Sequence, residues 1–362
     1  MHTGAAHARR RRACLMPATP SYAPAGPGPA AAPRLAARPA GYGALPDVAV
    51  PAPAALAGAT MGTTWSARLA LPPGVAAPAA RAAIQQALDQ VVAQMSTWDD
   101  RSDLSRYNRA ATGWQTLPDD CLFVLDHALR LAAATDGAYD PTVGPLVNAW
   151  GFGPPPHPSE PPSAAVIDAL RQRCGWRRVR LDAAGRRAWQ PGGAYLDLSG
   201  IAKGHGVDRA AQALEHLGVR DYLVEVGGEL RAGGARPDRQ PWRVAVEVPD
   251  GSADHALALA LHDRAIATSG DYRRYREGAA GRYAHTLDPR SGRPVDNGVA
   301  SVTVVHRSCM QADALATALA VLGERDGLAY AQRHEVAALF IVRAAGRLRL
   351  AASSAFTALA GA

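Results

Sequence analysis

The chain of 362 residues contains almost no lysine. Lysine and arginine together number 39, and Lys203 is the single lysine among them. Arginine is a planar, permanently charged fork, whereas lysine is a compact ammonium with three rotatable donors. A position that keeps lysine in such a chain is therefore a candidate contact for an anionic or oxygen-bearing ligand. At this point the alternative is a surface lysine retained by chance.

Other features that would assign a function class are also missing. The cysteines form no C-x-x-C pair, which argues against a zinc knuckle, a redox motif or a dense disulfide framework. No apolar run reaches about 18 residues, so we expect no transmembrane helix. No internal repeat is evident. The four cysteines are Cys14, Cys121, Cys174 and Cys309.

The positive charge is concentrated at the N-terminus. Residues 1–60 hold six arginines and one acidic residue, out of 39 basic and 32 acidic residues in all, so 33 basic and 31 acidic residues remain. A basic tail is weaker evidence for nucleic-acid binding than a basic folded face, and we expect no nucleic-acid partner. We predict a disordered leader rich in Pro, Ala and Arg over residues 1–58 and one folded domain over residues 59–356.

The N-terminus carries no legible export signal. Arg9–Arg12 resembles the start of a signal peptide, but no apolar h-region follows it. Cys14 lacks the apolar stretch that would precede a lipoprotein cysteine. The sequence leaves the compartment open.

Hydrophobic periodicity predicts a mixture of helices and strands. Strands and helices follow one another without regular βαβ spacing, which favours an α+β fold over a doubly wound sheet. The expected helices span residues 81–95, 122–134, 206–217 and 311–322. The expected strands span residues 63–71, 194–198, 222–226, 242–248, 302–305, 336–342 and 347–350, and we expect a loop after Asp103.

The segment from Ser308 to Leu319 contains an acidic and a hydroxyl side chain in an apolar setting. Ser308 and Gln311 fit a capping box that begins a helix. Asp313 and Thr317 then lie one turn apart on one helix face. A divalent cation would suit their hard oxygen atoms. The alternative is an acid favoured by the helix dipole beside a threonine bonded to its own backbone.

Three further segments carry polar residues at turns. Asp197–Gly206 joins a predicted strand to a helix through glycines, a junction that lets backbone approach a ligand. It has neither Walker spacing nor a G-x-G-x-x-G fingerprint. His285 precedes an Asp-Pro turn and is a candidate general base, or a structural histidine. Asp136–Pro145 reads as a rigid loop that carries carboxylates.

These segments form an ordered series of motifs. In chain order they include MGTTWS from Met61, MSTWD from Met95, DGAYDPTVGP from Asp136, DLSGIAKGHGVD from Asp197, VEVGGE from Val224, TSGDY from Thr268, HTLDPRSG from His285 and ADALATAL from Ala312. The series closely resembles the ApbE family of FAD:protein FMN transferases, from about residue 59 to 356.

The resemblance implies a fold and an activity. It implies a single catalytic unit of two α+β lobes with an FAD cleft between them. It implies Mg²⁺-dependent transfer of FMN from FAD to a Thr or Ser hydroxyl of a target protein, such as an electron-transfer subunit, with release of AMP. Members of the family are usually periplasmic and attached to the inner membrane.

The resemblance also implies roles for particular residues. Those implied for the flavin side of the site are Met61, Trp98, Ala138, Tyr139 and Asp140. Those implied for the rest of FAD are Asp197, Lys203, Gly227, Gly228, Ser269, Gly270, Asp271 and Leu287. The implied metal ligands are Asp313, Thr317 and the carbonyl of Gly200, and the residues implied in the chemistry are His285 and Asp313.

Two other functions stay open from the sequence. Water in place of the acceptor hydroxyl would make the protein an FAD pyrophosphatase that yields FMN and AMP. A non-catalytic flavin-binding protein would need Trp98 and the flavin loop but not the pair formed by Asp313 and Thr317.

Overall fold

The structure is a computed structural model, and it describes residues 52–156, 158, 160–249, 257–272, 275–278 and 281–360. The leader expected over residues 1–58 lies almost entirely outside the described residues. The first strand, β1 (Ala54–Thr60), begins ahead of Ala59, where we expected the folded part to start. No helix in the described part of the chain is both long enough and apolar enough to cross a membrane.

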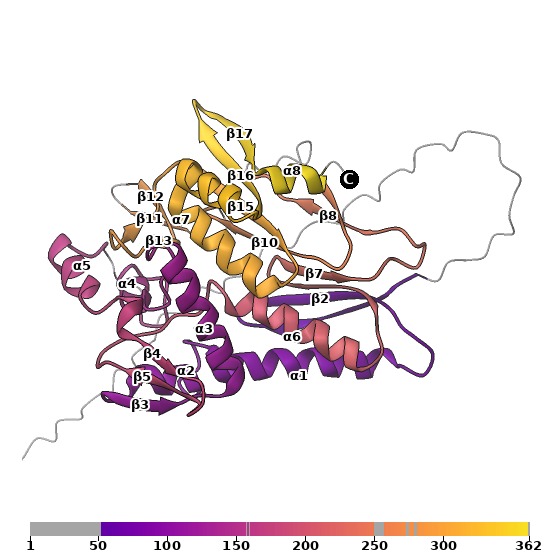
Figure 1. The fold of residues 1–362 in the computed structure, drawn as a ribbon, viewed down its shortest axis with the longest axis horizontal. Coiled ribbons are helices and arrows are strands. Elements are labelled where there is room, and N and C mark those ends of the chain that lie inside the picture. Colours follow the sequence, from indigo (N-terminus) through magenta and orange to yellow (C-terminus); the bar gives the residue numbers. More distant parts are fainter. Residues whose placement is uncertain are drawn as a thin grey trace, which may run out of the picture. The chain divides into compact units, whose positions relative to one another are not determined.

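An antiparallel sheet of eight strands forms the centre of the described fold (Figure 1). Its strand order is β1-β2-β6-β7-β10-β15-β16-β17. The strands after β1 are β2 (Thr63–Ala70), β6 (Asp221–Val226), β7 (Glu229–Gly233), β10 (Ala265–Gly270), β15 (Val299–His306), β16 (Ala337–Ala344) and β17 (Arg347–Ala352). Side chains alternate between the two faces along each strand, so each face needs its own cover.

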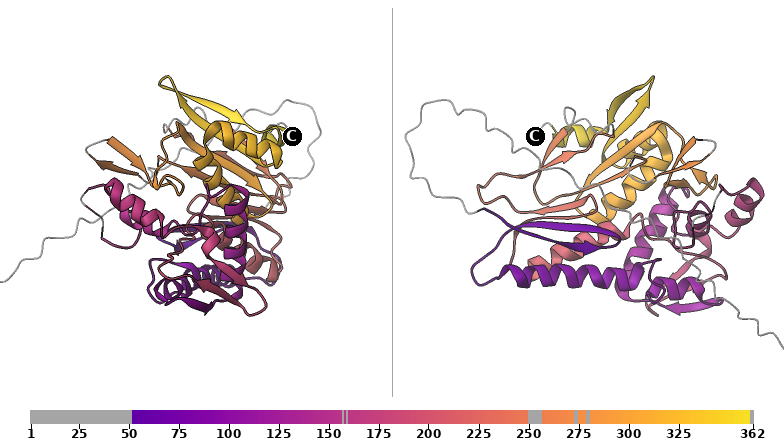
Figure 2. Two further views of the ribbon diagram at one scale, coloured as in Figure 1. Left: turned by 60° about the vertical axis from the view of Figure 1, so that its left-hand side comes forward. Right: turned by 180° about the vertical axis from the view of Figure 1, so that it is seen from behind.

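Three long helices cover one face of this sheet (Figures 1 and 2). They are α1 (Ala77–Met95), α6 (Ala202–His216) and α7 (Cys309–Arg333). Val224 of β6 packs with Val207 and Leu214 of α6 in one buried cluster. Val302 of β15 packs with Leu319 of α7 in another. We call this the helix face.

A two-stranded ribbon and a short helix cover the opposite face. The ribbon pairs β8 (Trp242–Val246) with β9 (Leu257–Leu261), and the helix is α8 (Ser354–Ala360). Trp242, Leu259, Ile266, Leu339 and Phe356 belong to one buried apolar cluster beneath them. We call this the ribbon face.

A smaller lobe packs beside the sheet. Its core includes Met310, Ala314 and Ala318 of α7, so α7 packs against both lobes. The α+β architecture that the sequence predicts is confirmed. The elements of the smaller lobe are α2 (Asp103–Arg109), β3 (Gly113–Thr116), α3 (Asp119–Ala134), α4 (Gly144–Ala149), α5 (Ala164–Arg171), the 3₁₀ turn η1 (Trp176–Arg178), β4 (Arg180–Asp182) and β5 (Arg187–Gln190). Two short hairpins follow β10 in the chain, β11 (Tyr275–Gly278) with β12 (Gly281–Ala284), and β13 (Leu287–Asp288) with β14 (Arg293–Pro294).

The prediction of a strand over residues 194–198 is wrong. This segment is extended but belongs to no sheet. A side-chain amide takes the place of a neighbouring strand, since Asn108 accepts from the Leu196 N–H at 2.7 Å and donates to the Leu196 carbonyl at 2.9 Å. The Asp197 N–H donates to the Pro141 carbonyl at 2.8 Å. These bonds satisfy both backbone groups of Leu196 and the N–H of Asp197 without a neighbouring strand.

The helices also differ from expectation at several points. The expected loop after Asp103 is the helix α2, whose N-cap Ser102 accepts from the Ser105 N–H. Helix α6 begins at Ala202 rather than at 206, which places Lys203 in its first turn. Helix α7 continues past Leu322 through a kink at Gly323, where φ is +80°. A glycine at positive φ ends a regular helix, but apolar packing on both sides lets α7 resume.

Candidate active site

Lys203 forms a buried ion pair with a residue of the neighbouring strand. Its ammonium lies 2.5 Å from Oε1 of Glu229, which directly follows the Gly227-Gly228 turn. The Glu229 side chain is 3% exposed and that of Lys203 is 34% exposed. Burial opposes the charge of the ammonium, but the carboxylates of Glu229 and Asp313 raise the pKa of Lys203 above its ordinary value. Lys203 is therefore held as a cation at the edge of a buried acidic cluster.

Asp313 lies against the first turn of α6. Its Oδ2 accepts from the Gly204 N–H at 3.0 Å, and the residue is 3% exposed. Burial raises the pKa of Asp313, although Lys203 and the Gly204 hydrogen bond lower it. A Cβ at Gly204 would overlap the Cys309 carbonyl, so glycine here allows α6 and α7 to approach closely.

Thr317, one turn after Asp313, meets residues from three other segments. Its hydroxyl is 3.0 Å from the hydroxyl of Ser269 on β10. A Cβ built at Gly200 would lie 3.2 Å from the Thr317 hydroxyl and 3.5 Å from the Tyr139 ring. The fold thus gathers Gly200, Tyr139, Ser269, Asp313 and Thr317 from positions far apart in the sequence.

Two polar atoms of this cluster have no hydrogen-bond partner among the residues that the structure describes. They are Oη of Tyr139 and Oε2 of Glu229, and both are buried. Burial raises the pKa of Tyr139 well above its ordinary value, and Asp313 reinforces that shift. Burial likewise raises the pKa of Glu229 to about 7 against the attraction of Lys203. Buried polar atoms without partners are costly, which is typical of a site that binds a polar ligand.

The oxygen atoms at this point suit a hard divalent cation. Asp313 offers a carboxylate, Thr317 a hydroxyl and Gly200 a backbone carbonyl, which are the ligand types that Mg²⁺ takes. Within the described ranges, no group of three or more His, Cys, Asp or Glu side chains is placed to hold a metal ion. A site here would therefore use one carboxylate with neutral oxygen donors, and the residues present fit it.

The loop implied for the flavin side is internally braced. Asp140 accepts from the Thr142 N–H at 2.8 Å, from the Thr142 hydroxyl at 2.6 Å and from the Trp176 N–H at 3.1 Å. Asp197 accepts from the Ser199 N–H at 2.8 Å. These two carboxylates shape their loops, and Ala138 and Tyr139, which directly precede Asp140, are buried.

The turns that frame the opposite side of α6 have unusual backbones. Met61 has φ of +49° in the β1–β2 turn, and a Cβ at Gly206 would lie 2.8 Å from its terminal methyl group. Gly227 and Gly228 have φ of +58° and +105° in the β6–β7 turn. The Gly228 N–H donates to Glu225 at 2.7 Å. Both turns therefore hold backbone at positive φ, and the Met61 side chain reaches from its turn to α6.

Trp98 presents a large exposed aromatic surface. Its side chain is 59% exposed, and its backbone N–H donates to the Ser96 hydroxyl at 3.0 Å. An exposed indole on a braced loop is suited to stack on a planar ring.

The remaining predicted residues lie along β10 and the segment after β12. A small cavity of about 20 Å³ is lined by Ser269, Gly270 and Asp271 together with Ala284 and Thr286, which flank His285. The fold therefore brings the segment of His285 beside the end of β10. Two predicted residues have other contacts, since Asp271 accepts two bonds from Arg343 at 2.6 and 2.8 Å and Leu287 packs in an apolar cluster with Trp150.

The sequence between residues 61 and 340 matches the model of the ApbE family. This stretch covers most of the described chain and every segment of the cluster. The chain belongs to the ApbE family.

The chain is similar to several proteins named FAD:protein FMN transferase. The chain is 42% identical over 306 residues to that of Vibrio cholerae serotype O1, covering 83% of this chain and 91% of the relative. It is 38% identical over 314 residues to that of Haemophilus influenzae, covering 84% and 90%.

Solved ApbE structures share the fold. The flavin transferase ApbE from Vibrio cholerae superposes with a TM-score of 0.80 at 41% identity, covering 85% of this chain and 100% of that structure. The flavinyl transferase ApbE from Pseudomonas stutzeri in its apo form gives a TM-score of 0.80 at 39% identity, covering 86% and 97%.

Sequence reasoning missed Glu229 as a member of this ApbE site. It ends the VEVGGE motif, but that motif drew attention to its glycines. The signal was present, because a strand following a Gly-Gly turn places Glu229 and Arg231 on the same face. A buried acid on that face needs a cationic partner.

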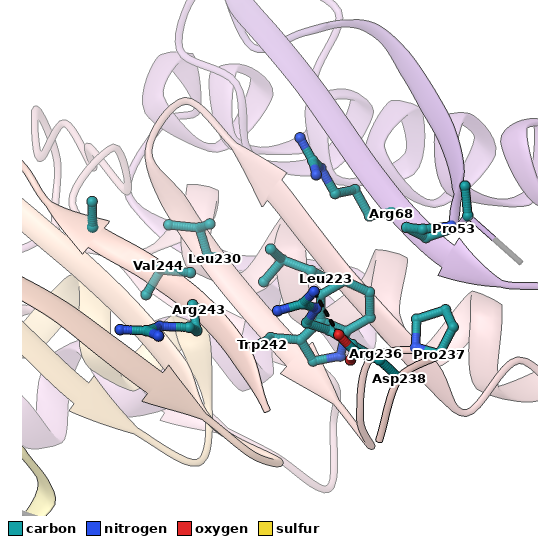
Figure 3. Close-up of a pocket in the computed structure, with 12 residues that line it drawn as sticks. Pro53, Arg68, Leu223, Leu230, Arg236, Pro237, Asp238, Trp242, Arg243 and Val244 are labelled. Carbon is teal, nitrogen blue, oxygen red and sulfur yellow. Dashed lines mark ion pairs between the residues drawn. The ribbon is translucent and has the colours of Figure 1, made fainter. Parts of the chain in front are cut away.

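A larger groove than the cavity beside β10 lies elsewhere on the described structure. A groove of about 740 Å³ lies between β2, β6, β7 and β8, where Leu223 and Trp242 form an apolar floor between Arg68 and Arg243 (Figure 3). No residue that the sequence predicts for the site lines this groove. The acidic cluster on the helix face is therefore the better candidate for the chemistry.

Proposed function

We propose that this protein transfers FMN from FAD to a threonine or serine hydroxyl of a target protein and releases AMP, with Mg²⁺ as the activating ion. The observation that carries the proposal is the buried cluster of Lys203, Glu229 and Asp313 beside Thr317. Within the described structure, this cluster brings together the Lys203 ammonium, hard oxygen donors and two buried polar atoms without hydrogen-bond partners, on an ApbE fold.

The reaction exchanges the phosphoanhydride bond of the FAD diphosphate for a phosphoester bond to the acceptor. The acceptor oxygen forms a bond to the phosphorus of the FMN half, and the bond from that phosphorus to the bridging oxygen breaks. AMP leaves with the bridging oxygen, and the hydroxyl proton passes to a base. Neutralising the diphosphate and aligning the hydroxyl are the main tasks of a phosphoryl-transfer site.

The residues divide these tasks. Asp313, Thr317 and the Gly200 carbonyl hold the ion, which when bound supplies positive charge to the diphosphate. Lys203 supplies a second positive charge to the diphosphate, and its ion pair with Glu229 fixes the position of the ammonium. Trp98 and Met61 contact the flavin ring. The loop of Ala138, Tyr139 and Asp140 lines the same part of the site. His285 takes the proton from the acceptor hydroxyl.

The other residues implied for FAD frame the nucleotide. Asp197 and the Gly227-Gly228 turn contact it from either side of α6. Ser269, Gly270, Asp271 and Leu287 contact it from β10 and the hairpin beyond. The acceptor is a protein with an accessible Thr or Ser, such as an electron-transfer subunit.

The test is a labelling reaction with three distinct outcomes. The protein is incubated with FAD, Mg²⁺ and an acceptor domain that carries a threonine, and flavin fluorescence is read on a denaturing gel. A fluorescent acceptor band is expected. FMN and AMP without a band would mean hydrolysis, and intact FAD would mean a flavin-binding protein.

Two variants on one helix test the ion assignment. Asp313→Ala is expected to abolish labelling, because it removes the only carboxylate of the donor set. Asp326→Ala changes the same residue type on α7, but its carboxylate is exposed and pairs with Arg325. That control should label at the wild-type rate. Equal labelling by both variants would refute the role of Asp313.

A further inference from the structure

Asp208 is a buried carboxylate whose hydrogen bonds are fully used. It lies on α6 and is 6% exposed. Oδ1 accepts from the Cys309 N–H at 3.0 Å and from Arg231 at 2.8 Å. Oδ2 accepts from the Ser308 hydroxyl at 2.7 Å and from the Met310 N–H at 3.0 Å. Four donors saturate an acceptor-only group, so its orientation is fixed.

These donors join three elements of the helix face. Two of the N–H groups belong to the first turn of α7, where helix amides have no partner within the helix and favour a negative charge. Ser308 donates to Asp208 and also caps α7 by accepting from the Gln311 N–H at 3.3 Å. Arg231 lies on β7. Asp208 therefore ties the start of α7 and the middle of β7 to α6.

The same three elements supply the candidate active site. Lys203 and Gly204 lie on α6, Asp313 on α7 and Glu229 on β7. Lys203 and Gly204 lie about one turn before Asp208, Asp313 lies about one turn after Met310, and Glu229 lies two residues before Arg231. The Gly204 N–H donates to Asp313 at 3.0 Å, across the contact between α6 and α7.

We propose that Asp208 is a positioning residue that sets the distance between Asp313 and the first turn of α6. The contacts of Asp208 require no ion. The effect that we expect on ion binding at Asp313 rests on the function proposed above. In Asp208→Asn, the side-chain NH₂ group replaces one of the two carboxylate oxygens. It therefore points at two groups that donated hydrogen bonds to that oxygen. Two donors then face each other, and α7 shifts away from α6.

The direct readout is exchange of the Gly204 amide with deuterated solvent, measured without added metal. In Asp208→Asn we expect it to exchange about tenfold faster relative to the Val224 amide of the sheet. Ser353→Ala is the stability control, because Ser353 is fully buried and its hydroxyl bonds to Val336, Ala338 and Phe356, which are remote in sequence from α6. Its Gly204/Val224 ratio should equal that of the wild type.

A graded pair keeps the test decisive if Asp208→Asn does not fold. Ser308→Ala removes one of the four bonds and should raise the exchange ratio by a smaller factor. Ser308→Thr keeps the hydroxyl and should restore it. An unchanged ratio in Asp208→Asn, or in Ser308→Ala where the first does not fold, would overturn the proposal.

The second readout is binding of Mn²⁺, followed by the electron paramagnetic signal of the free ion. Asp208→Asn should raise the dissociation constant about tenfold and leave FAD binding without metal within about twofold. Unaltered Mn²⁺ binding would overturn the positioning of Asp313. A wild-type protein that binds no Mn²⁺ would instead refute the proposed ion site, and Gly204 exchange would still decide the role of Asp208.

Discussion

The helix face and the ribbon face of the sheet bury side chains of different chemistry. Beneath the ribbon, Trp242, Leu259 and Phe356 belong to an apolar cluster. Ser353, at the start of α8, is buried there, and its hydroxyl has three hydrogen-bond partners. This face is arranged as a core that stabilises the fold.

The helix face buries three carboxylates. Asp208 is fully hydrogen-bonded, whereas Glu229 has an oxygen without a partner in the described structure, and burial raises the pKa of both Glu229 and Asp313. Charges buried in this way reduce stability unless a partner compensates them. The difference between the faces separates residues that stabilise the fold from residues that serve a ligand.

The sharpest test of this difference is Asp313→Asn. We expect FMN transfer to fall about 10³-fold, equivalent to about 4 kcal/mol of transition-state stabilisation, because the ion loses its only charged ligand. The free energy of unfolding of the metal-free protein should not fall, because the carboxylate itself is disfavoured by burial. Labelling rates and urea unfolding measure the two quantities. A large loss of stability with a modest loss of rate would assign Asp313 to the core.

A second test uses the pKa of Glu229. Burial raises this pKa from 4.5 to about 7, so the folded protein holds the proton more tightly than the unfolded chain. The free energy of unfolding therefore falls as pH rises from about 4.5 to about 7 and is level above that, with a total effect of at most roughly 3 kcal/mol. Glu229→Gln should remove this fall.

Urea unfolding of both metal-free proteins at pH 5 and pH 8 provides the measurement. At each pH, the free energy of unfolding of Glu229→Gln is subtracted from that of the wild type. This difference should be larger at pH 5 than at pH 8. If the difference is the same at both pH values, Glu229 does not titrate in this range, and the helix face is less strained than the structure indicates.

A third test concerns the single lysine. Lys203→Arg keeps the charge, but the wider guanidinium does not fit where the ammonium meets Glu229 at 2.5 Å. We expect KM for FAD to rise about tenfold with the melting temperature nearly unchanged. Arg209→Lys is the matched control, since Arg209 lies on the same helix and pairs with Asp120 at 3.3 Å. Wild-type kinetics in Lys203→Arg would make the lysine incidental.

The sequence predicted elements better than it predicted junctions. The periodicity of apolar residues correctly predicted α1 and the hairpin of β16 and β17, because burial of one face of an element requires that pattern. The segment 194–198 looked like a strand, but its partner is the side chain of Asn108, and periodicity carries no information about such a partner. Motif matching predicted roles for Asp313 and Lys203, and the structure places Lys203 against Glu229. The position of Glu229 itself depends on which face of β7 lies under α6, and strand alternation alone does not reveal that.

The smallest effect is expected on the ribbon face, and it tests whether the two faces are independent. Ile266 lies on β10, the strand that ends with Ser269 and Gly270, but its side chain packs in the ribbon-face cluster and is 4% exposed. Ile266→Val should lower the free energy of unfolding by about 1 kcal/mol, because one buried methylene is lost. Transfer rate and KM for FAD should stay at their wild-type values, since no site side chain contacts the new gap. Urea unfolding and labelling kinetics on the same preparation check this. A change in KM larger than about twofold would show that packing under the ribbon passes through β10 to Ser269, and the two faces would then act as one unit.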